Sequence, residues 1–183
     1  FIIKIIVLCL VTIKVNAIEK IILFGDSLMA GYGLPNEQHL SVVLQNSLEI
    51  EGYNIEIVNG SVSGSTSSGG LNIAEWTLSE SNIDLMILCL GANDMLRGIN
   101  PKETKNNLEE IVKIAKRKNI KVIIAGMIAP TSYGSGYKKS FDKIFYDLSK
   151  KYKLQLIPFL LEGVAQKPEF NLSDGMHPND QGT

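Results

Sequence analysis

The sequence predicts an α/β fold, in which a parallel sheet of about five strands is covered by helices on both faces. Short apolar runs alternate with segments of helical periodicity along the 183 residues, as in parallel strands joined by crossover helices. Most runs are continuously apolar, as expected for strands buried on both faces. Polar clusters follow the first three runs, at the strand ends where open α/β sheets bind ligands. These observations describe a flavodoxin-like three-layer α/β/α sandwich.

Five runs are the expected strands of this sheet. They cover residues 20–24, 55–58, 85–90, 121–127 and, with a weaker pattern, 154–157. Cys89 lies inside the third run, where we expect it to pack as a small hydrophobic residue. The length of the chain suits one domain with a substantial core.

The helices between the strands show their own signals. Asn100, Pro101 and Glu103 offer an N-cap, a first-turn proline and a capping-box acid for one helix, which ends in a basic turn at 116–118. Another helix carries a single apolar stripe, which we interpret as a core face: Phe141, Ile144, Phe145, Leu148 and Tyr152. Further helices are expected near 39–51 and 71–81, and a Ser/Gly-rich loop at 60–70.

The first 17 residues predict a secretory signal peptide. Lys4 precedes an apolar run at 5–13, and Ala17 provides the small residue of a cleavage site. The run is too short to span a bilayer, although a buried strand or a membrane anchor is the alternative reading. Lipidation at Cys9 is disfavoured because bulky Leu8 precedes it. We therefore expect a periplasmic or secreted domain at 18–183, with no stable membrane anchor after cleavage.

The composition restricts the partners. A net charge of −1 gives no basic excess for nucleic acid binding, and 45% apolar with 20% charged residues is typical of a globular domain. We expect a monomer that acts on a small molecule and binds no nucleic acid.

Ser27 and His177 are candidates for a nucleophile and its base. Ser27 follows the first strand at a turn into a helix, where it could instead be an ordinary N-cap. Only two histidines exist, and His39 begins a helical pattern, so we interpret it as an ordinary, partly exposed residue. His177 follows Asp174 by three residues in an irregular segment, a spacing that lets one loop carry an imidazole and the carboxylate that orients it.

Two residues could donate hydrogen bonds to an oxyanion. Gly64 can bring a bare backbone N–H close to a ligand, and Asn93 can offer its side-chain amide from the next loop. The alternatives are a simple positive-φ glycine and an asparagine that stabilises a turn.

Four short blocks together resemble those of the SGNH (GDSL-type) hydrolases. They are Phe24-Gly25-Asp26-Ser27-Leu28, Gly64, Gly91-Ala92-Asn93-Asp94 and Asp174-Gly175-Met176-His177-Pro178-Asn179. A closer likeness, to bacterial periplasmic arylesterases and multifunctional thioesterase–lysophospholipases, is carried by residues 31–33, 93–98 and 158–162. The resemblance covers nearly all of the chain beyond the predicted signal peptide.

The resemblance implies a serine esterase that needs no cofactor and acts on small aryl or alkyl esters, acyl thioesters or lysophospholipids. It implies Ser27 as nucleophile, His177 as base and Asp174 as the orienting acid, with oxyanion donors on Ser27, Gly64 and Asn93. It also implies an acyl pocket, for which the candidates are Leu28, Met95, Leu96, Ile99 and Pro130. Similar proteins continue past the block that contains His177 into a last helix. We expect this helix to be absent here, because the given sequence stops at Thr183.

Other motifs are incomplete, but two rival functions stay open. The chain has no Gly-x-Ser-x-Gly elbow, and the glycines at 64–69 lack the Lys-Ser/Thr of a P-loop. One rival is a binding module that kept the fold without the chemistry. The other is a Mg²⁺-dependent phosphoesterase, if Asp26, Asp94 and Asp174 gathered at one edge of the sheet.

Overall fold

The computed structural model describes residues 19–183 and contains a five-stranded sheet in which every neighbouring pair is parallel. The strands are β1 (Lys20–Gly25), β2 (Glu56–Asn59), β3 (Leu85–Cys89), β4 (Lys121–Ala125) and β5 (Gln155–Ile157). Their order is β2-β1-β3-β4-β5, the flavodoxin-like order. The predicted fold class is therefore confirmed, and each predicted strand lies within about two residues of an observed one.

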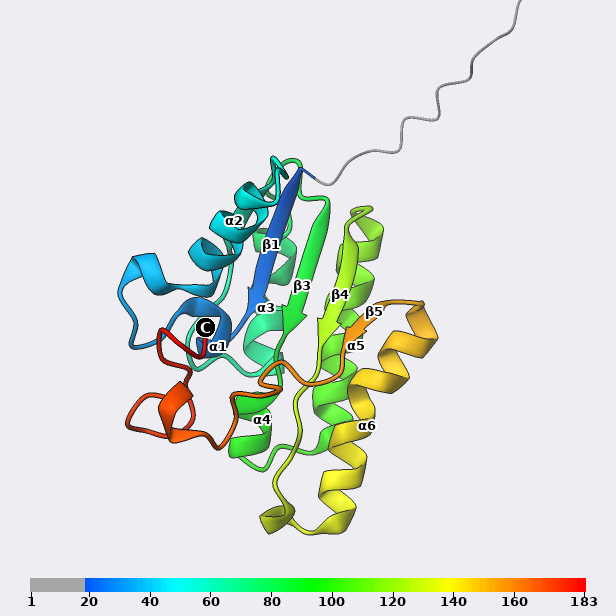
Figure 1. Cartoon of the computed structure of the whole chain (residues 1–183). Helices are drawn as coiled ribbons and strands as arrows, with labels where there is room; N and C mark the ends of the chain where they lie inside the picture. Colours follow the sequence, from blue (N-terminus) through cyan, green and yellow to red (C-terminus); the bar gives the residue numbers. More distant parts are fainter. Residues whose placement is uncertain (1–18) are drawn as a thin grey trace, which may run out of the picture.

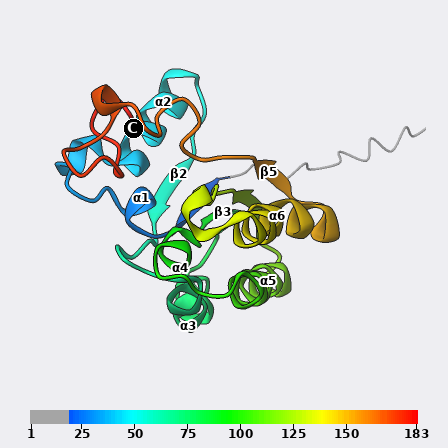
Figure 2. The same ribbon diagram turned by 90° about the horizontal axis from the view of Figure 1, so that it is seen from below.

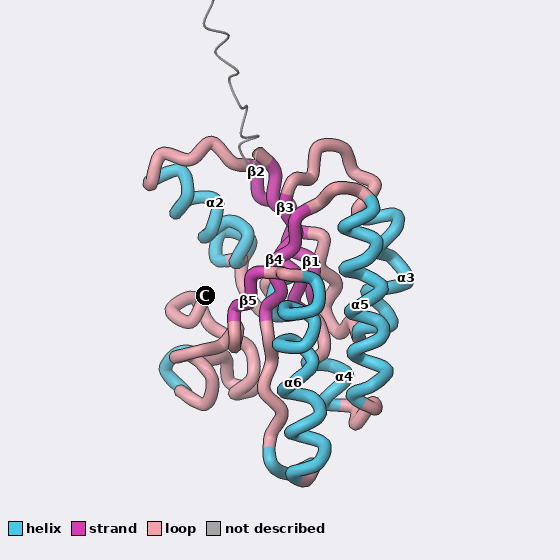
Figure 3. The backbone as a smooth tube through the Cα atoms, turned by 90° about the vertical axis from the view of Figure 1, so that its right-hand side faces the viewer, coloured by secondary structure: helices cyan, strands magenta, loops and turns pink. Residues whose placement is uncertain are grey.

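Helices cover both faces of the sheet. α3 (Ser67–Thr77), α5 (Pro101–Arg117) and α6 (Ser135–Tyr152) lie on one side, and α2 (Leu40–Ile50) lies on the other (Figures 2 and 3). Two short helices, α1 (Ser27–Ala30) and α4 (Ala92–Leu96), follow β1 and β3 directly. Three 3-10 turns complete the described elements: η1 (Asn36–Gln38), η2 (Thr131–Tyr133) and η3 (Pro168–Phe170). The strand arrows in Figure 1 point toward the end of the molecule where α1, α4 and the C-terminal segment lie.

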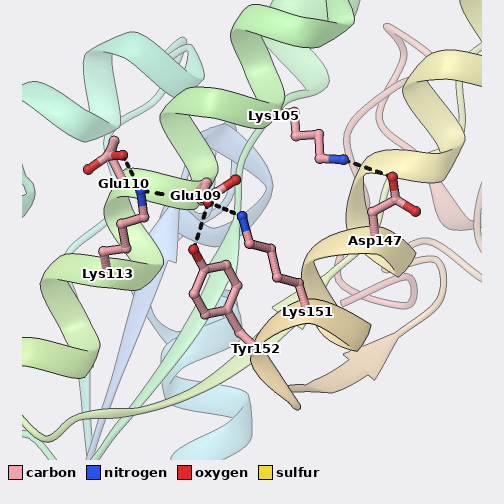
Figure 4. Close-up of polar contacts among 7 residues, drawn as sticks. All are labelled: Lys105, Glu109, Glu110, Lys113, Asp147, Lys151 and Tyr152. Atoms are coloured by element: carbon pink, nitrogen blue, oxygen red, sulfur yellow. Dashed lines mark hydrogen bonds and ion pairs between the residues drawn. The ribbon is translucent and has the colours of Figure 1, made fainter.

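The apolar face predicted for α6, the helix that packs beside α5, is confirmed. α6 buries the predicted stripe, with Phe141, Ile144, Phe145 and Leu148 all almost inaccessible to solvent. At its C-terminal end Lys151 and the Tyr152 hydroxyl reach Glu109 of α5 at 2.6 and 2.7 Å (Figure 4). These two hydrogen bonds lower the pKa of Glu109 to about 2. The apolar stripe and these polar contacts together hold the two longest helices side by side.

Two helical predictions need correction. α3 begins at Ser67 rather than near 71, because the Thr66 side chain accepts the Gly69 N–H at 3.2 Å and caps the helix. The end of the Ser/Gly-rich loop is therefore helical, and buried Gly70 packs against Leu90 there. α4 replaces the loop that the sequence predicts around Asn93, because its five residues are too few to show a helical period.

The other helices match their predictions more closely. α5 starts at Pro101, and the Asn100 side chain caps it by accepting the Lys102 N–H at 2.9 Å. Cys89 is a buried free thiol in β3, as expected. None of the helices within residues 19–183 is long and apolar enough to cross a membrane. The predicted signal peptide lies outside the described residues and stays a prediction.

Candidate active site

Ser27 is the first residue of α1, directly beyond the carboxyl end of β1. The N-cap of this helix is Asp26, whose side chain accepts the Leu28 N–H at 3.1 Å. The reading of Ser27 as a capping residue is therefore wrong, and its hydroxyl is free for other contacts. Gly25 permits this sharp turn at the sheet, because a Cβ there would lie 2.6 Å from the Cys89 carbonyl oxygen.

Asp174 and His177 lie in a narrow segment closed by an antiparallel bridge between Asn171 and Pro178. One Asp174 carboxylate oxygen accepts the backbone N–H groups of Met176 and His177 at 2.9 and 3.0 Å. The other accepts the His177 Nδ1–H at 2.7 Å. The backbone N–H groups, followed by the imidazole, lower the pKa of Asp174 to about 2. Asp174 is thus an ionised group that fixes the tautomer and orientation of His177.

The other ring nitrogen of His177 reaches Ser27. Its Nε2 lies 2.8 Å from the Ser27 Oγ, across 150 residues of sequence. Because Nδ1 carries the proton that is donated to Asp174, Nε2 is the acceptor for the serine hydroxyl. The structure therefore brings the three residues into one line of hydrogen bonds, a geometry suited to removing the proton from Ser27.

The two candidate oxyanion donors, Gly64 and Asn93, line the same cavity as Ser27 and His177. Gly64 has a φ of +77°, and a Cβ built on it would enter open space, with no atom within 4 Å. Asn93 belongs to α4, and its Nδ2 donates to Asp26 Oδ2 at 3.3 Å. Arg97, at the end of α4, donates from Nη2 to the Gly64 carbonyl at 3.0 Å and ties the two donor segments together.

Asp26 is a site residue whose role the sequence reasoning missed. It is fully buried. One of its carboxylate oxygens accepts the Leu28 N–H of α1, and the other accepts a hydrogen bond from the amide of Asn93. Burial raises the pKa of Asp26 to about 6, against the lowering effect of these hydrogen bonds. The available signal was its place directly before Ser27, but only the fold shows that Asn93 lies within reach.

Asp94 is engaged in anchoring α4. It is fully buried and accepts hydrogen bonds from the Ser67 backbone N–H at 2.7 Å, the Ser67 hydroxyl and the Thr104 hydroxyl at 3.0 Å. The three aspartates of the rival metal site therefore have separate partners. Among residues 19–183, no group of three or more His, Cys, Asp or Glu side chains is placed to hold a metal ion, which corrects that alternative.

A cavity of about 1210 Å³ opens at this end of the sheet. Its lining includes Ser27, Gly64, Asn93 and His177. Four of the five predicted pocket residues also line it: Leu28, Met95, Leu96 and Pro130.

The fifth pocket candidate, Ile99, is not among these lining residues. It lies beyond the end of α4 and outside the lining, where its carbonyl accepts the Tyr137 hydroxyl at 2.9 Å. Sequence reasoning missed the apolar lining from the segments that follow β4 and β5, notably Met127, Ile128 and Phe159. His39 is partly exposed, as expected, lies outside the lining and donates from Nε2 to the Leu34 carbonyl at 3.0 Å.

Comparison with known proteins places this geometry in a family. The model of the GDSL-like lipase/acylhydrolase family matches residues 23–183. The chain belongs to this family. An arylesterase of Vibrio mimicus is 37% identical over 166 residues, which cover 91% of this chain and 83% of that protein. The thioesterase 1/protease 1/lysophospholipase L1 of Escherichia coli is 32% identical over 172 residues, covering 94% and 81%.

A solved structure agrees with this membership. The crystal structure of AlinE4, an SGNH-hydrolase family esterase, superposes with a TM-score of 0.83 at 38% identity, covering 91% of this chain and 89% of that chain. The resemblance of the four blocks to SGNH hydrolases is thereby confirmed. In this GDSL-type hydrolase the four blocks lie beyond the carboxyl ends of β1, β2 and β3 and in the C-terminal segment, and all four contribute to one cavity lining.

Proposed function

We propose that this chain hydrolyses small aryl or alkyl esters, acyl thioesters or lysophospholipids through an acyl-enzyme formed on Ser27. The observation that carries the proposal is the line of hydrogen bonds from Ser27 through His177 to Asp174, with distances of 2.8 and 2.7 Å. The names of the relatives, an arylesterase and a thioesterase/lysophospholipase, support the choice of substrate classes.

In the first half-reaction the Ser27 Oγ attacks the acyl carbonyl carbon while His177 Nε2 takes the hydroxyl proton. The N–H groups of Ser27 and Gly64 and the amide of Asn93 then stabilise the negative oxygen of the tetrahedral intermediate. As the C–O or C–S bond breaks, His177 returns the proton to the leaving alcohol or thiol. In the second half-reaction water attacks the acyl-serine by the same route, the acid leaves and Ser27 regains its proton.

Asp174 supports both half-reactions electrostatically. His177 becomes a cation each time it holds the proton, and the carboxylate at 2.7 Å stabilises that cation. The low pKa of Asp174, about 2, keeps the carboxylate ionised throughout this chemistry.

The cavity lining supports an apolar acyl group. Met95 and Leu96 of α4 line the same cavity as Met127, Ile128 and Phe159. An acyl chain bound among these side chains buries apolar surface, worth about 0.8 kcal/mol per CH₂ group. Measuring kcat/KM for p-nitrophenyl esters and acyl thioesters of increasing chain length would show the acyl length beyond which binding no longer improves and which leaving group is preferred.

The direct test of the proposal is Ser27→Ala. We expect turnover of p-nitrophenyl butyrate to fall by about 10⁴ or more, as in other triad enzymes, and labelling by a fluorophosphonate probe to disappear. Ser47→Ala is the matched control and should keep full activity, because Ser47 is an exposed residue of α2 whose hydroxyl, within residues 19–183, hydrogen-bonds only to the Val43 carbonyl. Retention of most activity in Ser27→Ala would refute the proposed nucleophile.

Two assays address the rival functions. A binding module would leave wild-type Ser27 unlabelled by the fluorophosphonate probe. A metal-dependent phosphoesterase would lose its activity in EDTA and ignore serine-directed inhibitors. We expect the wild-type protein to be labelled at Ser27 and to keep its esterase activity in EDTA.

A further inference from the structure

Tyr32 contacts the imidazole of His177 through its ring. The two ring centroids lie 4.5 Å apart, and the ring planes are inclined by 38°. Tyr32 lines the cavity and is 53% exposed, and its hydroxyl makes no hydrogen bond to the described part of the chain. The aromatic face is therefore the part of Tyr32 that acts on its surroundings.

The segment that carries Tyr32 is fixed on both sides. Gly31 ends α1 in the left-handed region at φ +81° and lies directly against the ring of His39. Gly33 lies against Leu172, because a Cβ there would fall 2.7 Å from Leu172 Cδ1. The Leu172 N–H in turn donates to the His177 carbonyl at 2.7 Å. An exposed tyrosine is thus held against the segment that contains His177.

Three groups act electrostatically on the His177 imidazole. Asp174, on the same segment, accepts the Nδ1 proton, and buried Asp26 acts from the turn between β1 and α1. Tyr32 adds the face of an aromatic ring, which attracts a cation through its quadrupole. The imidazole gains a proton and becomes a cation in each tetrahedral intermediate, so the ring favours the reacting state over the resting one.

We propose that Tyr32 is a positioning residue, whose ring holds the His177 imidazole in line with Ser27 and stabilises its protonated form. The inference rests on the proposed function, because it assumes that His177 is the base. Two consequences distinguish it from a structural role. Any aromatic residue suffices at this position, and loss of the ring changes the pH dependence of the reaction as well as its rate.

The test compares Tyr32→Leu and Tyr32→Phe with wild type. For Tyr32→Leu we expect kcat on p-nitrophenyl butyrate and on ethyl butyrate to fall about two- to fivefold with little change in KM. The acid limb of the kcat/KM profile should move about half a pH unit lower, because His177 holds its proton less strongly without the ring. Tyr32→Phe should keep both the rate and the limb.

Tyr146→Leu is the matched control, since Tyr146 is 57% exposed on α6 and lies outside the cavity lining. It should behave as wild type. An unmoved acid limb in Tyr32→Leu, a loss confined to the aryl ester or to KM, or an equal loss in Tyr32→Phe would each overturn the inference. Ser27→Ala separates this failure from failure of the proposed function, because an inactive Ser27→Ala beside an unaffected Tyr32→Leu removes only the role of Tyr32.

Discussion

Asp26→Asn tests whether the buried Asp26 carboxylate destabilises the folded protein while it positions the amide of Asn93. Asp26 is fully buried, and its pKa is raised from an ordinary 3.8 to about 6, mainly by burial. A raised pKa means that folding disfavours the ionised form. The contribution of this group to stability is therefore complete below about pH 4 and is lost as the pH rises through 6.

The size of the effect follows from the shift. A difference of about two pKa units corresponds to about 3 kcal/mol of unfolding free energy lost once Asp26 is ionised in both states, as at pH 8. Asparagine removes the charge and can still accept the Leu28 N–H. It loses the hydrogen bond from Asn93, which costs about 1 kcal/mol. We expect Asp26→Asn to be about 2 kcal/mol more stable at pH 8, with no gain at pH 4.

The same substitution should impair catalysis. The carboxylate of Asp26 accepts from both the Leu28 N–H and the Asn93 amide, whereas an asparagine offers only one acceptor oxygen. Whichever way the new amide turns, one of the two donors loses its partner. We expect the amide of Asn93 to lose its orientation and kcat to fall about 10- to 100-fold.

Thermal and urea unfolding at pH 4 and pH 8, with kcat on p-nitrophenyl butyrate at pH 8, measure both effects. Asp84→Asn is the matched control, because the backbone N–H groups of Glu19 and Lys20 lower the pKa of Asp84. It should be less stable at pH 8 and fully active. A loss of stability at pH 8 in Asp26→Asn would refute the argument from burial, and an unchanged kcat would refute the role of Asp26 in placing Asn93.

Two further substitutions probe the oxyanion donors. Asn93→Ala should lower turnover about 10²–10³-fold while the circular dichroism spectrum stays native, and an unchanged rate in a folded variant would exclude Asn93 from the oxyanion hole. Arg97→Met should lower kcat about 3- to 10-fold, because the Gly64 carbonyl loses the hydrogen bond that Arg97 Nη2 donates at 3.0 Å. The control Arg117→Met, on the surface of α5, should leave kcat unchanged. Equal rates for the two arginine variants would show that Gly64 needs no such support.

The strands could be predicted because strands that are buried on both faces consist almost entirely of apolar residues. β1 and β3 are enclosed on both faces, so continuous apolar runs were a sufficient signal. The start of α3 could not be predicted in the same way, because its first turn is rich in serine and glycine, which favour loops over helices. The Thr66 cap and the packing of Gly70 against Leu90 outweigh that preference, and both depend on the tertiary structure.

The site shows a similar division. Ser27, Asp174 and His177 could be named from motif order and from the scarcity of histidine, and the structure brings all three together. The partner of Asn93 could not be named, because a contact between Asp26 and a side chain 67 residues away appears only once β1 and β3 are paired. Met95 and Leu96 of α4 line the cavity, whereas Ile99, three residues beyond the end of that helix, lies outside the lining.

α4 explains how a site assembled from distant segments can have fixed donors. Three of the residues at this helix make contacts to four different parts of the fold: Asn93 to Asp26, Asp94 to Ser67 and Thr104, and Arg97 to Gly64. A free loop would have to order its donors during the reaction, at a cost in conformational entropy. A short helix anchored by a buried carboxylate sets them in advance, which is the condition under which such donors lower a reaction barrier most. A displacement of α4 should therefore disturb both Asn93 and Gly64 together, and the catalytic losses of Asn93→Ala and Arg97→Met should be less than additive.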